Sequence, residues 1–307
     1  MSRIVDIAYH IPKEKITNKY LSDKFPKWTP EKIFEKTGIK ERGKSAINET
    51  ACDLAILASE KLFSKSEIDK NNIDTLIFVT QTPNQCLPST SCEIHSFLGL
   101  SKNCGTFDVN QGCSGYIYGL FLANSLIESG SAKYVLLLTG DTYTKIIDPE
   151  DSSAMPLFGD GASASIIGPD FESSLNKSIG RFEFGTDGSK SSFLNCDFGG
   201  FRKMPSKWSS LYMNGPGVMT FTLDVIPKAI NNFLENQGLN NNDIDLIFLH
   251  QANKFILERI YKKTNFLDRG VICLENFGNT VSSSIPIALA NKINFGEKYK
   301  TNIKSKI

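Results

Sequence analysis

The stretch that decides the fold is GCSGYIYGLFLANSLIESG at residues 112–130, because residues 278–296, GNTVSSSIPIALANKINFG, repeat its pattern. Each begins with a glycine, enters a helix-like run through serine or threonine, carries Leu-Ala-Asn and stops at a glycine, a frequent helix terminator. The segments upstream are also alike: IDKNNIDTLIFVTQT at residues 68–82 matches LNNNDIDLIFLHQA at residues 239–252. Both predict a polar turn followed by a short buried strand.

The repeat predicts two similar α/β halves packed together, because a unit of this length that occurs twice is too long for a solenoid. We place the boundary in the polar segment PDFESSLNKS, which gives an N-terminal half at residues 1–172 and a C-terminal half at residues 173–307. After its helix, the first half continues into a buried strand at residues 131–141. The second half ends in EKYKTNIKSKI, whose apolar pattern breaks down, so its last strand is expected to be missing.

Composition narrows the class of protein. The chain has 307 residues, of which 40% are hydrophobic and 22% charged, as in an ordinary globular protein. Its net charge of +1 gives no reason to expect binding to nucleic acid or to a membrane surface. No targeting segment or membrane span is predicted. The seven cysteines show neither Cys-x-x-Cys pairs nor metal-site spacing, which indicates free thiols in a cytoplasmic protein without a metal.

Cys113 is the first candidate for chemistry, since it lies between a strand-like run and the start of the first repeated helix. The thiolate is the nucleophilic form of cysteine, and the N–H groups and dipole of a helix N-terminus favour negative charge. Gly112 and Gly115 would allow a sharp turn and leave room beside the sulfur. A small core residue is the alternative, because free cysteines are often buried.

His250 and Asn279 are the next candidates. His250 ends a predicted strand, and α/β folds place their sites at the carboxyl ends of strands. Asn279 holds in the second repeat the position that Cys113 holds in the first, so we expect two loops at helix starts to face one cavity. The alternatives are a structural histidine and a turn asparagine. The other histidines, His10 and His95, are interpreted as structural or surface residues.

Two other kinds of site are rejected on context. Gly159, Gly161 and Ala164 form Gly-x-Gly-x-x-Ala, but the following residues alternate like a strand, whereas a dinucleotide fingerprint opens a helix. A nicotinamide cofactor is therefore not expected. The order cysteine, histidine, asparagine also occurs in papain-like proteases, but the aromatic residue that follows their cysteine is absent here and Cys113 is far from the N-terminus.

Five motifs in order resemble those of β-ketoacyl-acyl-carrier-protein synthase III, a family of the thiolase superfamily. They are TGIKER, DVNQGCSG, FGDGASA, LHQAN and NFGNTVSSSIP, and the resemblance runs from about residue 4 to residue 296. It implies a thiolase-like α/β fold, with two pseudo-symmetric halves in a five-layer α/β/α/β/α sandwich and a homodimer as the usual assembly. The last strand or strands are the part that this sequence is expected to lack.

The resemblance also implies roles for the three candidates. Cys113 would take an acyl primer as a thioester, while His250 and Asn279 would promote decarboxylation of malonyl-acyl carrier protein and stabilise the enolate. Two preorganised donors lower the barrier where an oxygen gains negative charge. The enolate would attack the thioester in a Claisen condensation, in fatty acid or specialised acyl-chain synthesis. The substrates would be acyl-CoA or acyl-carrier protein and malonyl-carrier protein, with no cofactor.

Two substrate positions depart from the family pattern. The family's adenine-stacking tryptophan is Lys32 here and its nearby arginine is Lys36, which can still meet a phosphate but cannot stack like arginine. This favours an acyl-carrier-protein primer over coenzyme A. The bulky aromatic with which a partner subunit often closes the primer pocket is Leu87, beside Cys86. We therefore expect a longer or branched acyl group to fit.

Carrier-protein docking is expected on the helix after LHQAN. Lys262 and Lys263 match two basic positions of the family, a third is Phe255, and Lys254 and Arg259 can substitute for it. A basic surface there would complement an acidic carrier protein.

The C-terminus keeps two alternatives open. In the family, a Gly-rich turn after the last strand supplies one backbone N–H of the oxyanion hole, and loss of such a donor costs about 3 kcal/mol. A truncated, inactive or non-catalytic partner subunit of a ketosynthase pair is one alternative, and a thiolase-fold acyltransferase to oxygen or nitrogen acceptors is another. The retained Cys113, His250 and Asn279 favour decarboxylative condensation.

Overall fold

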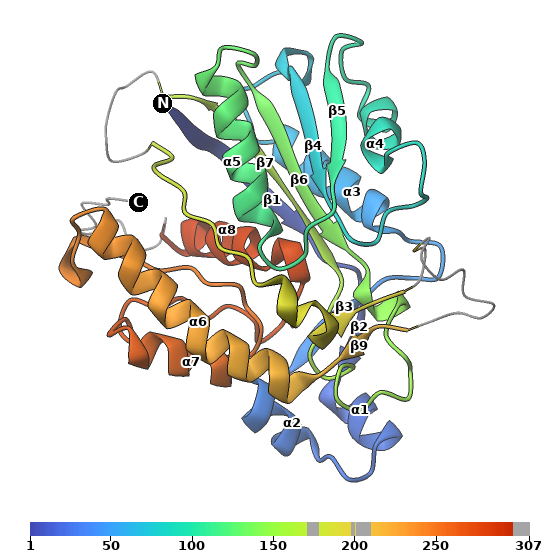
Figure 1. The fold of residues 1–307 in the computed structure, drawn as a ribbon. Helices are drawn as coiled ribbons and strands as arrows, with labels where there is room; N and C mark the ends of the chain where they lie inside the picture. The colour runs from blue at the N-terminus through green and yellow to red at the C-terminus, as the bar shows by residue number, and fades with distance from the viewer. Residues whose placement is uncertain (171–177, 198–199, 201–209, 297–307) are drawn as a thin grey trace.

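A mixed β-sheet in the N-terminal half is the centre of the fold (Figure 1). A computed structural model of the chain describes residues 1–170, 178–197, 200 and 210–296. Within these residues the sheet has five strands, in the order β1 (Ser2–His10), β7 (Gly161–Pro169), β6 (Val135–Asp141), β4 (Thr75–Val79) and β5 (Gly105–Val109). β4 is parallel to β5 and β6, whereas β7 is antiparallel to β6 and β1.

Helices cover both faces of this sheet, which explains the uninterrupted apolar runs at residues 76–79 of β4 and 135–138 of β6. Side chains alternate between the faces along each strand. Phe78 and Leu138 pack against α3 (Ala51–Phe63) and α4 (Thr90–Leu98). Val79 and Leu137 pack on the opposite face against α5 (Gly115–Glu128), and α8 (Ser284–Gly296) joins this cluster through Ile285. The start of α8 thus shares a core with the first half.

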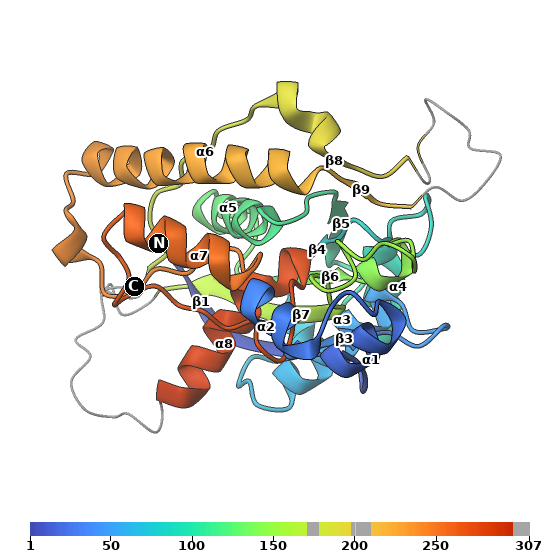
Figure 2. The ribbon, with the colours of Figure 1, turned by 90° about the horizontal axis from the view of Figure 1, so that it is seen from below.

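The remaining elements form a small N-terminal lobe and the outer layer of the C-terminal half (Figures 1 and 2). The lobe contains β2 (Glu14–Thr17), α1 (Asn18–Lys24), α2 (Pro30–Thr37) and β3 (Glu41–Lys44). The outer layer contains β8 (Leu194–Asn195), β9 (Tyr212–Met213), α6 (Gly215–Asn236) and α7 (Lys254–Lys263). Short 3₁₀ helices are η1 (Lys70–Asn72), η2 (Tyr143–Lys145), η3 (Gly188–Phe193), η4 (Asn241–Asp243) and η5 (Val281–Ser283).

The C-terminal half repeats the first half only in part within the described ranges. The predicted strand at residues 246–249 is represented by a single parallel bridge between Ile247 and Gly270, the counterpart of the parallel β4–β5 pair. In the first half, β6 pairs with both β4 and β7. By the repeat, the counterpart of β6 would follow α8, at residues 297–307. The expectation of a missing last strand therefore falls outside the described residues.

Several local predictions are confirmed. Both repeated stretches form helices, α5 and α8. The stretch with the Gly-x-Gly-x-x-Ala spacing continues into the strand β7, as its alternation predicted. No helix in the described part of the chain is long and apolar enough to cross a membrane.

Candidate active site

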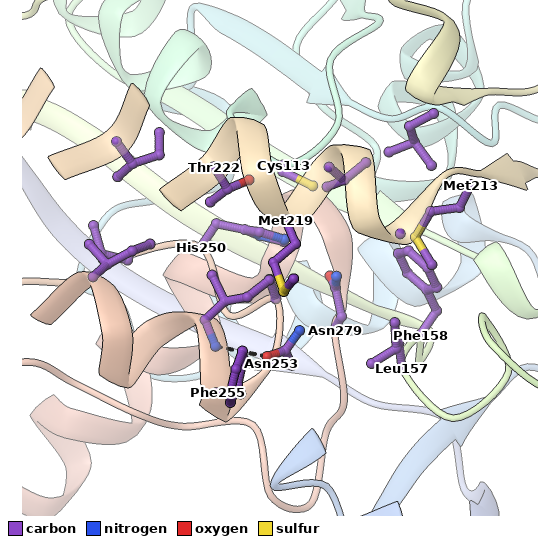
Figure 3. A pocket seen from close by; sticks show the side chains of 18 of the residues that line it. Cys113, Leu157, Phe158, Met213, Met219, Thr222, His250, Asn253, Phe255 and Asn279 are labelled. Atoms are coloured by element: carbon purple, nitrogen blue, oxygen red, sulfur yellow. Dashed lines mark hydrogen bonds between the residues drawn. The ribbon is translucent and has the colours of Figure 1, made fainter. Parts of the chain in front are cut away.

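Cys113, His250 and Asn279 lie at one cavity of about 850 Å³ (Figure 3). Cys113 precedes α5, His250 ends the segment before α7, and Asn279 precedes η5, so widely separated parts of the chain meet there. Figure 3 shows the three side chains directed into the same space beneath α6. Most of the other lining is apolar, including Phe158 and Met219. This matches the expectation that the two repeated helix starts face one cavity.

The Cys113 turn is held tightly against its neighbours. A Cβ on Gly112 would lie 2.5 Å from Gln81 Oε1, and a Cβ on Gly115 would lie 2.4 Å from Val79 Cγ1. Glycine at both positions therefore lets the turn approach the end of β4. Burial, aided by the negative charge of Asp141, raises the pKa of the Cys113 thiol to about 12. The thiol is thus neutral at pH 7 and needs a base to become a nucleophile.

His250 is positioned by a serine of η5–α8. Its Nδ1 lies 2.7 Å from Ser284 Oγ, which also accepts a hydrogen bond from the Gln251 backbone N–H at 3.2 Å. Because Nδ1 is engaged, Nε2 is the ring nitrogen that can meet the thiol or a substrate. Burial lowers the pKa of His250 to about 4, against a smaller opposing effect from a hydrogen bond with the Val281 backbone. The imidazole is therefore neutral at pH 7 and can take a proton.

Asn279 is fixed through both its backbone and its side chain. Its N–H donates to Leu157 O at 2.8 Å, and its C=O accepts from Gly159 N–H at 3.0 Å. Its side-chain Oδ1 accepts from the Val281 N–H at 3.0 Å. The Nδ2 amide, which carries the donors of this side chain, is therefore left to the cavity. The site combines a thiol, a neutral imidazole and an oriented amide donor.

Arg42 explains why three of the quoted motifs occur together in this fold. It is fully buried and donates to Ile16 O, Asn18 Oδ1 and Pro156 O at 2.8–3.0 Å. A Cβ on either Gly159 or Gly278 would lie 2.8 Å from the Cβ of Arg42. The arginine of TGIKER is thus the packing support for the FGDGASA and NFGN turns, and the glycines allow that contact. The sequence had identified the motifs but not this role for Arg42.

The predicted substrate residues lie in different environments. Lys36 lines the cavity, and its Nζ lies 4.6 Å from the ring centroid of Trp28. An aromatic ring is therefore present beside Lys36, although the family position predicted for it holds the exposed Lys32. Leu87 is 80% exposed and does not line the cavity of its own chain. The prediction that it closes a partner's pocket is not tested by a single chain.

The four predicted docking residues, Lys254, Arg259, Lys262 and Lys263, all lie on α7 and are exposed. Arg259 stacks 4.0 Å from the ring centroid of Phe255, which lines the cavity. Lys254 pairs with Glu258 at 3.7 Å. Lys263 donates to Leu223 O at 2.8 Å on α6. The basic surface therefore adjoins the cavity at Phe255.

The possible metal ligands do not form clusters in the residues that the structure describes. Within those ranges, no group of three or more histidine, cysteine, aspartate or glutamate side chains is placed to hold a metal ion. All seven cysteines lie in the described ranges and are free thiols.

The mixed α/β architecture and the cysteine, histidine and asparagine at one cavity define a thiolase-like condensing enzyme. The family description 3-Oxoacyl-[acyl-carrier-protein (ACP)] synthase III matches residues 107–188, and the description of its C-terminal part matches residues 234–301. Beta-ketoacyl-[acyl-carrier-protein] synthase III of Natranaerobius thermophilus is 33% identical over 299 residues, covering 95% of this chain and 90% of the relative. This chain belongs to the β-ketoacyl-acyl-carrier-protein synthase III family, which confirms the resemblance.

Solved structures agree with this assignment. A crystal structure of 3-oxoacyl-(acyl-carrier-protein) synthase III matches with a TM-score of 0.93 at 41% identity, covering 96% of this chain and 92% of that chain. The priming β-ketosynthase from the R1128 polyketide biosynthetic pathway matches with a TM-score of 0.86 at 28% identity, covering 96% of this chain and 88% of the other.

Sequence reasoning missed the residues that support the site. Asp141 is fully buried at the end of β6, and Val281 has a φ of 51°, which is unusual for a β-branched residue. Asp141 stands outside the five motifs, and Val281 lies within NFGNTVSSSIP but was not singled out there. The position of Asp141 at the carboxyl end of a buried strand was a usable signal, since α/β folds place polar groups of the site there. No pattern in the sequence signals the φ of Val281.

Proposed function

We propose that this protein condenses an acyl primer with malonyl-acyl carrier protein and releases carbon dioxide, through an acyl-Cys113 thioester. The observation that carries the proposal is the convergence of Cys113, His250 and Asn279 on one cavity with a mostly apolar lining. Membership of the synthase III family supports the reaction class. The names of the matched relatives support fatty acid or polyketide priming as the setting.

The first step is transfer of the acyl group to Cys113. Neutral His250 takes the thiol proton, and the sulfur attacks the thioester carbonyl of the primer. A carbon–sulfur bond to Cys113 forms, the bond to the donor's sulfur breaks, and the departing thiolate takes the proton from His250. The start of α5 faces Cys113 and favours negative charge there during attack. Nucleophile and base thus come from opposite halves of the chain.

The second step uses the malonyl group. Loss of carbon dioxide leaves its electron pair as an enolate, whose oxygen accepts hydrogen bonds from Asn279 Nδ2 and from His250. For this step His250 is the neutral tautomer with its proton on Nε2, and its Nδ1 accepts from the Ser284 hydroxyl. The enolate carbon attacks the acyl-Cys113 carbonyl and a carbon–carbon bond forms. The bond between the acyl carbon and the Cys113 sulfur breaks, and the departing thiolate takes one proton from solvent. Two such donors stabilise the transition state because charge develops where they point. No strong base is needed, since decarboxylation generates the carbanion.

A product assay tests the proposed function. Purified protein is incubated with malonyl-carrier protein and a series of acyl-CoA and acyl-carrier-protein primers. The mass of the carrier protein is then measured by mass spectrometry. We expect a 3-oxoacyl carrier two carbons longer than the primer, with one carbon dioxide released per product. A folded protein that yields no product with any primer contradicts the proposal and favours a non-catalytic subunit of a ketosynthase pair.

Carrier-protein docking on α7 is part of the proposal. The exposed basic side chains adjoin the cavity, so an acidic carrier bound there would present its thioester to Cys113. Arg259→Glu is expected to raise KM for malonyl-carrier protein while leaving acylation by acyl-CoA unchanged. Lys102→Glu, a charge reversal of an exposed lysine before β5, is the matched control. Equal effects of the two reversals would contradict docking at α7.

A homodimer is proposed from the edge of the sheet. β5 is the terminal strand in the order, so its outer edge is open among the described strands and could pair with a second copy. Asp108 of β5 accepts hydrogen bonds from Thr90 and Ser91, which ties the segment after Leu87 to that edge. Leu87 would then reach a partner's primer pocket and, being smaller than an aromatic, admit longer or branched acyl groups.

We also propose a binding site for the primer donor, a cellular location and a division of the chain into two halves. Lys36 beside Trp28 supports binding of a phosphate-bearing primer donor at the mouth of the cavity. Free thiols support a cytoplasmic location. The division into halves at residues 1–172 and 173–307 rests on the sequence repeat.

A further inference from the structure

Asp141 is a buried carboxylate that the proposed chemistry does not use. It ends β6 and is fully buried, and two loops bind it. Its Oδ1 accepts from the Gln81 backbone N–H at 2.8 Å, and its Oδ2 accepts from Ser282 Oγ at 2.5 Å and from Ser282 N–H at 3.4 Å. The ionisable groups that interact electrostatically with Asp141 are Asp160, Cys113 and Tyr143, and none of them is basic. A buried acid without a cationic partner is costly, so a role at the site would account for it.

One of these loops carries Asn279 and contains a strained residue. Val281 lies between Asn279 and Ser282, is fully buried and has a φ of 51°. A β-branched residue rarely adopts this backbone conformation, and surrounding structure must hold it there. The strained conformation directs the Val281 N–H to Asn279 Oδ1 at 3.0 Å, and the Val281 backbone also hydrogen-bonds His250. The orientation of the Asn279 side chain therefore depends on Val281, whereas His250 is also held by Ser284 through its Nδ1.

Val281 is held between two anchors. On one side, the Asn279 backbone is fixed by Leu157 and Gly159. On the other side, Ser282 is fixed by Asp141. Removal of either anchor would let the strained turn relax and would release the amide of Asn279 from its direction.

The same carboxylate reaches the nucleophile's turn. The backbone N–H of Gln81 donates to Asp141, and its side-chain Oε1 accepts a hydrogen bond from Tyr143 Oη at 2.6 Å. The same Oε1 packs against Gly112, where an added Cβ would lie only 2.5 Å from it. Asp141 thus ties the loop that supports Cys113 to the loop that carries Asn279.

We propose that Asp141 is a positioning residue that, through Ser282, holds Val281 in its left-handed conformation and so aims Asn279 at the malonyl thioester. This inference rests on the proposed function. It assigns Asp141 to the second half-reaction, because acylation of Cys113 does not require Asn279.

Removing the negative charge of Asp141 is expected to affect the rates of acylation and condensation in opposite directions. Burial raises the pKa of Asp141 to about 7, so part of the population is ionised at neutral pH. That negative charge raises the pKa of Cys113. Asp141→Asn removes this negative charge, which favours the thiolate of Cys113. The new asparagine amide group, however, would meet the N–H and O–H donors of Ser282 with donors of its own. We therefore expect acylation to be unchanged or faster and condensation to be slower.

The test separates the half-reactions in the full-length protein. Acyl-Cys113 is formed with acyl-CoA and followed by intact mass, and malonyl-carrier protein is then added to discharge it. Ser282→Ala and Asp141→Asn are each expected to slow discharge ~10-fold or more, since small misplacements of catalytic groups have large effects. Acylation should stay within about threefold of wild type or rise.

The matched control is Ser283→Ala. Ser283 is equally buried in the same turn and hydrogen-bonds Thr139 and Gly161 O, but not Asp141. Ser283→Ala should discharge the acyl group within about threefold of the wild-type rate. In a double variant, Ser282→Ala should add little to the loss caused by Asn279→Ala, because Ser282 and Asn279 act as one unit. Equal losses in the two serine variants, additive losses, or equal slowing of both half-reactions would overturn the inference. A wild-type protein that acylates but never discharges would instead reject the proposed function.

Discussion

The turns at Cys113 and Asn279 occupy equivalent places in the repeat but are held in different ways. The Sγ of Cys113 makes no side-chain hydrogen bond to another described residue, and contact of its glycine neighbours with β4 positions the turn. Asn279 is bound at its N–H, its C=O and its Oδ1. The nucleophile must form and break a bond in every turnover, whereas the amide must point in one direction while charge develops. In the proposed mechanism, the two copies of one helix start are therefore specialised for attack and for stabilisation.

The largest expected effect is at the nucleophile. Cys113→Ala should abolish the acyl adduct and reduce condensation ~1,000-fold or more, because no other group can form the thioester. Intact mass and product formation measure the two effects. An adduct that persists in Cys113→Ala would show that acylation occurs elsewhere.

A smaller and more selective effect is expected at the other turn. Asn279→Ala should slow discharge of acyl-Cys113 by ~100-fold, the effect of losing one preorganised donor, while the adduct still forms at nearly the wild-type rate. Single-turnover mass spectrometry with and without malonyl-carrier protein measures this split. If acylation and discharge fell together, the division of labour between the two turns would be wrong.

The glycines of the two turns should differ in their effect on stability. At Gly278, φ is 70° and an added Cβ would lie 2.8 Å from Arg42 Cβ and 3.0 Å from Leu157 O, neither of which can move away easily. Gly278→Ala should lower the free energy of unfolding by about 2–4 kcal/mol. At Gly112, the contact is the end of the Gln81 side chain, so Gly112→Ala should cost about 1 kcal/mol. Chemical denaturation compares them, and a reversed order would contradict the packing described.

A further effect on stability, of about the size expected for the glycine variants, is a pH dependence that comes from His250. Its pKa is lowered from 6.5 to about 4, so the unfolded chain binds more protons between these values and stability falls as pH drops through that window. From pH 7 to pH 5, the loss should be about 2 kcal/mol. Asp141 acts in the opposite direction, because its pKa is raised to about 7. The difference between wild type and His250→Asn isolates the histidine, and no pH-dependent difference would contradict its buried, neutral state.

The sequence was sufficient for the elements that local patterns encode. Apolar runs predicted a strand within residues 68–82 and another at residues 131–141, which the structure places at Thr75–Val79 and Val135–Asp141. The repeat predicted that Cys113 and Asn279 start equivalent helices at one cavity. The resemblance supplied the roles of these residues, and family membership supports them. The predicted strands and helix starts are confirmed because they are short-range features, whereas the roles of the residues stay a proposal.

The supporting structure could not be predicted in the same way. Arg42 packs against two glycine turns that are more than a hundred residues away in sequence, and its burial results from that tertiary contact. The strain at Val281 depends on Asp141 from the other half, and no local propensity indicates it. The sequence predicted that aromatic stacking is lost because Lys32 stands at the family's tryptophan position, whereas the fold brings Trp28 beside Lys36. Each of these features depends on which loops meet in space.

The most direct test of the account is the discharge of preformed acyl-Cys113 by malonyl-carrier protein, followed by intact mass in wild type and Asn279→Ala. The account predicts that both proteins form the same adduct with acyl-CoA. It further predicts that wild type loses the adduct as a 3-oxoacyl carrier and carbon dioxide appear, while Asn279→Ala retains it ~100-fold longer. Equal discharge by the two proteins, or an adduct that malonyl-carrier protein never removes from wild type, would contradict decarboxylative condensation at this site.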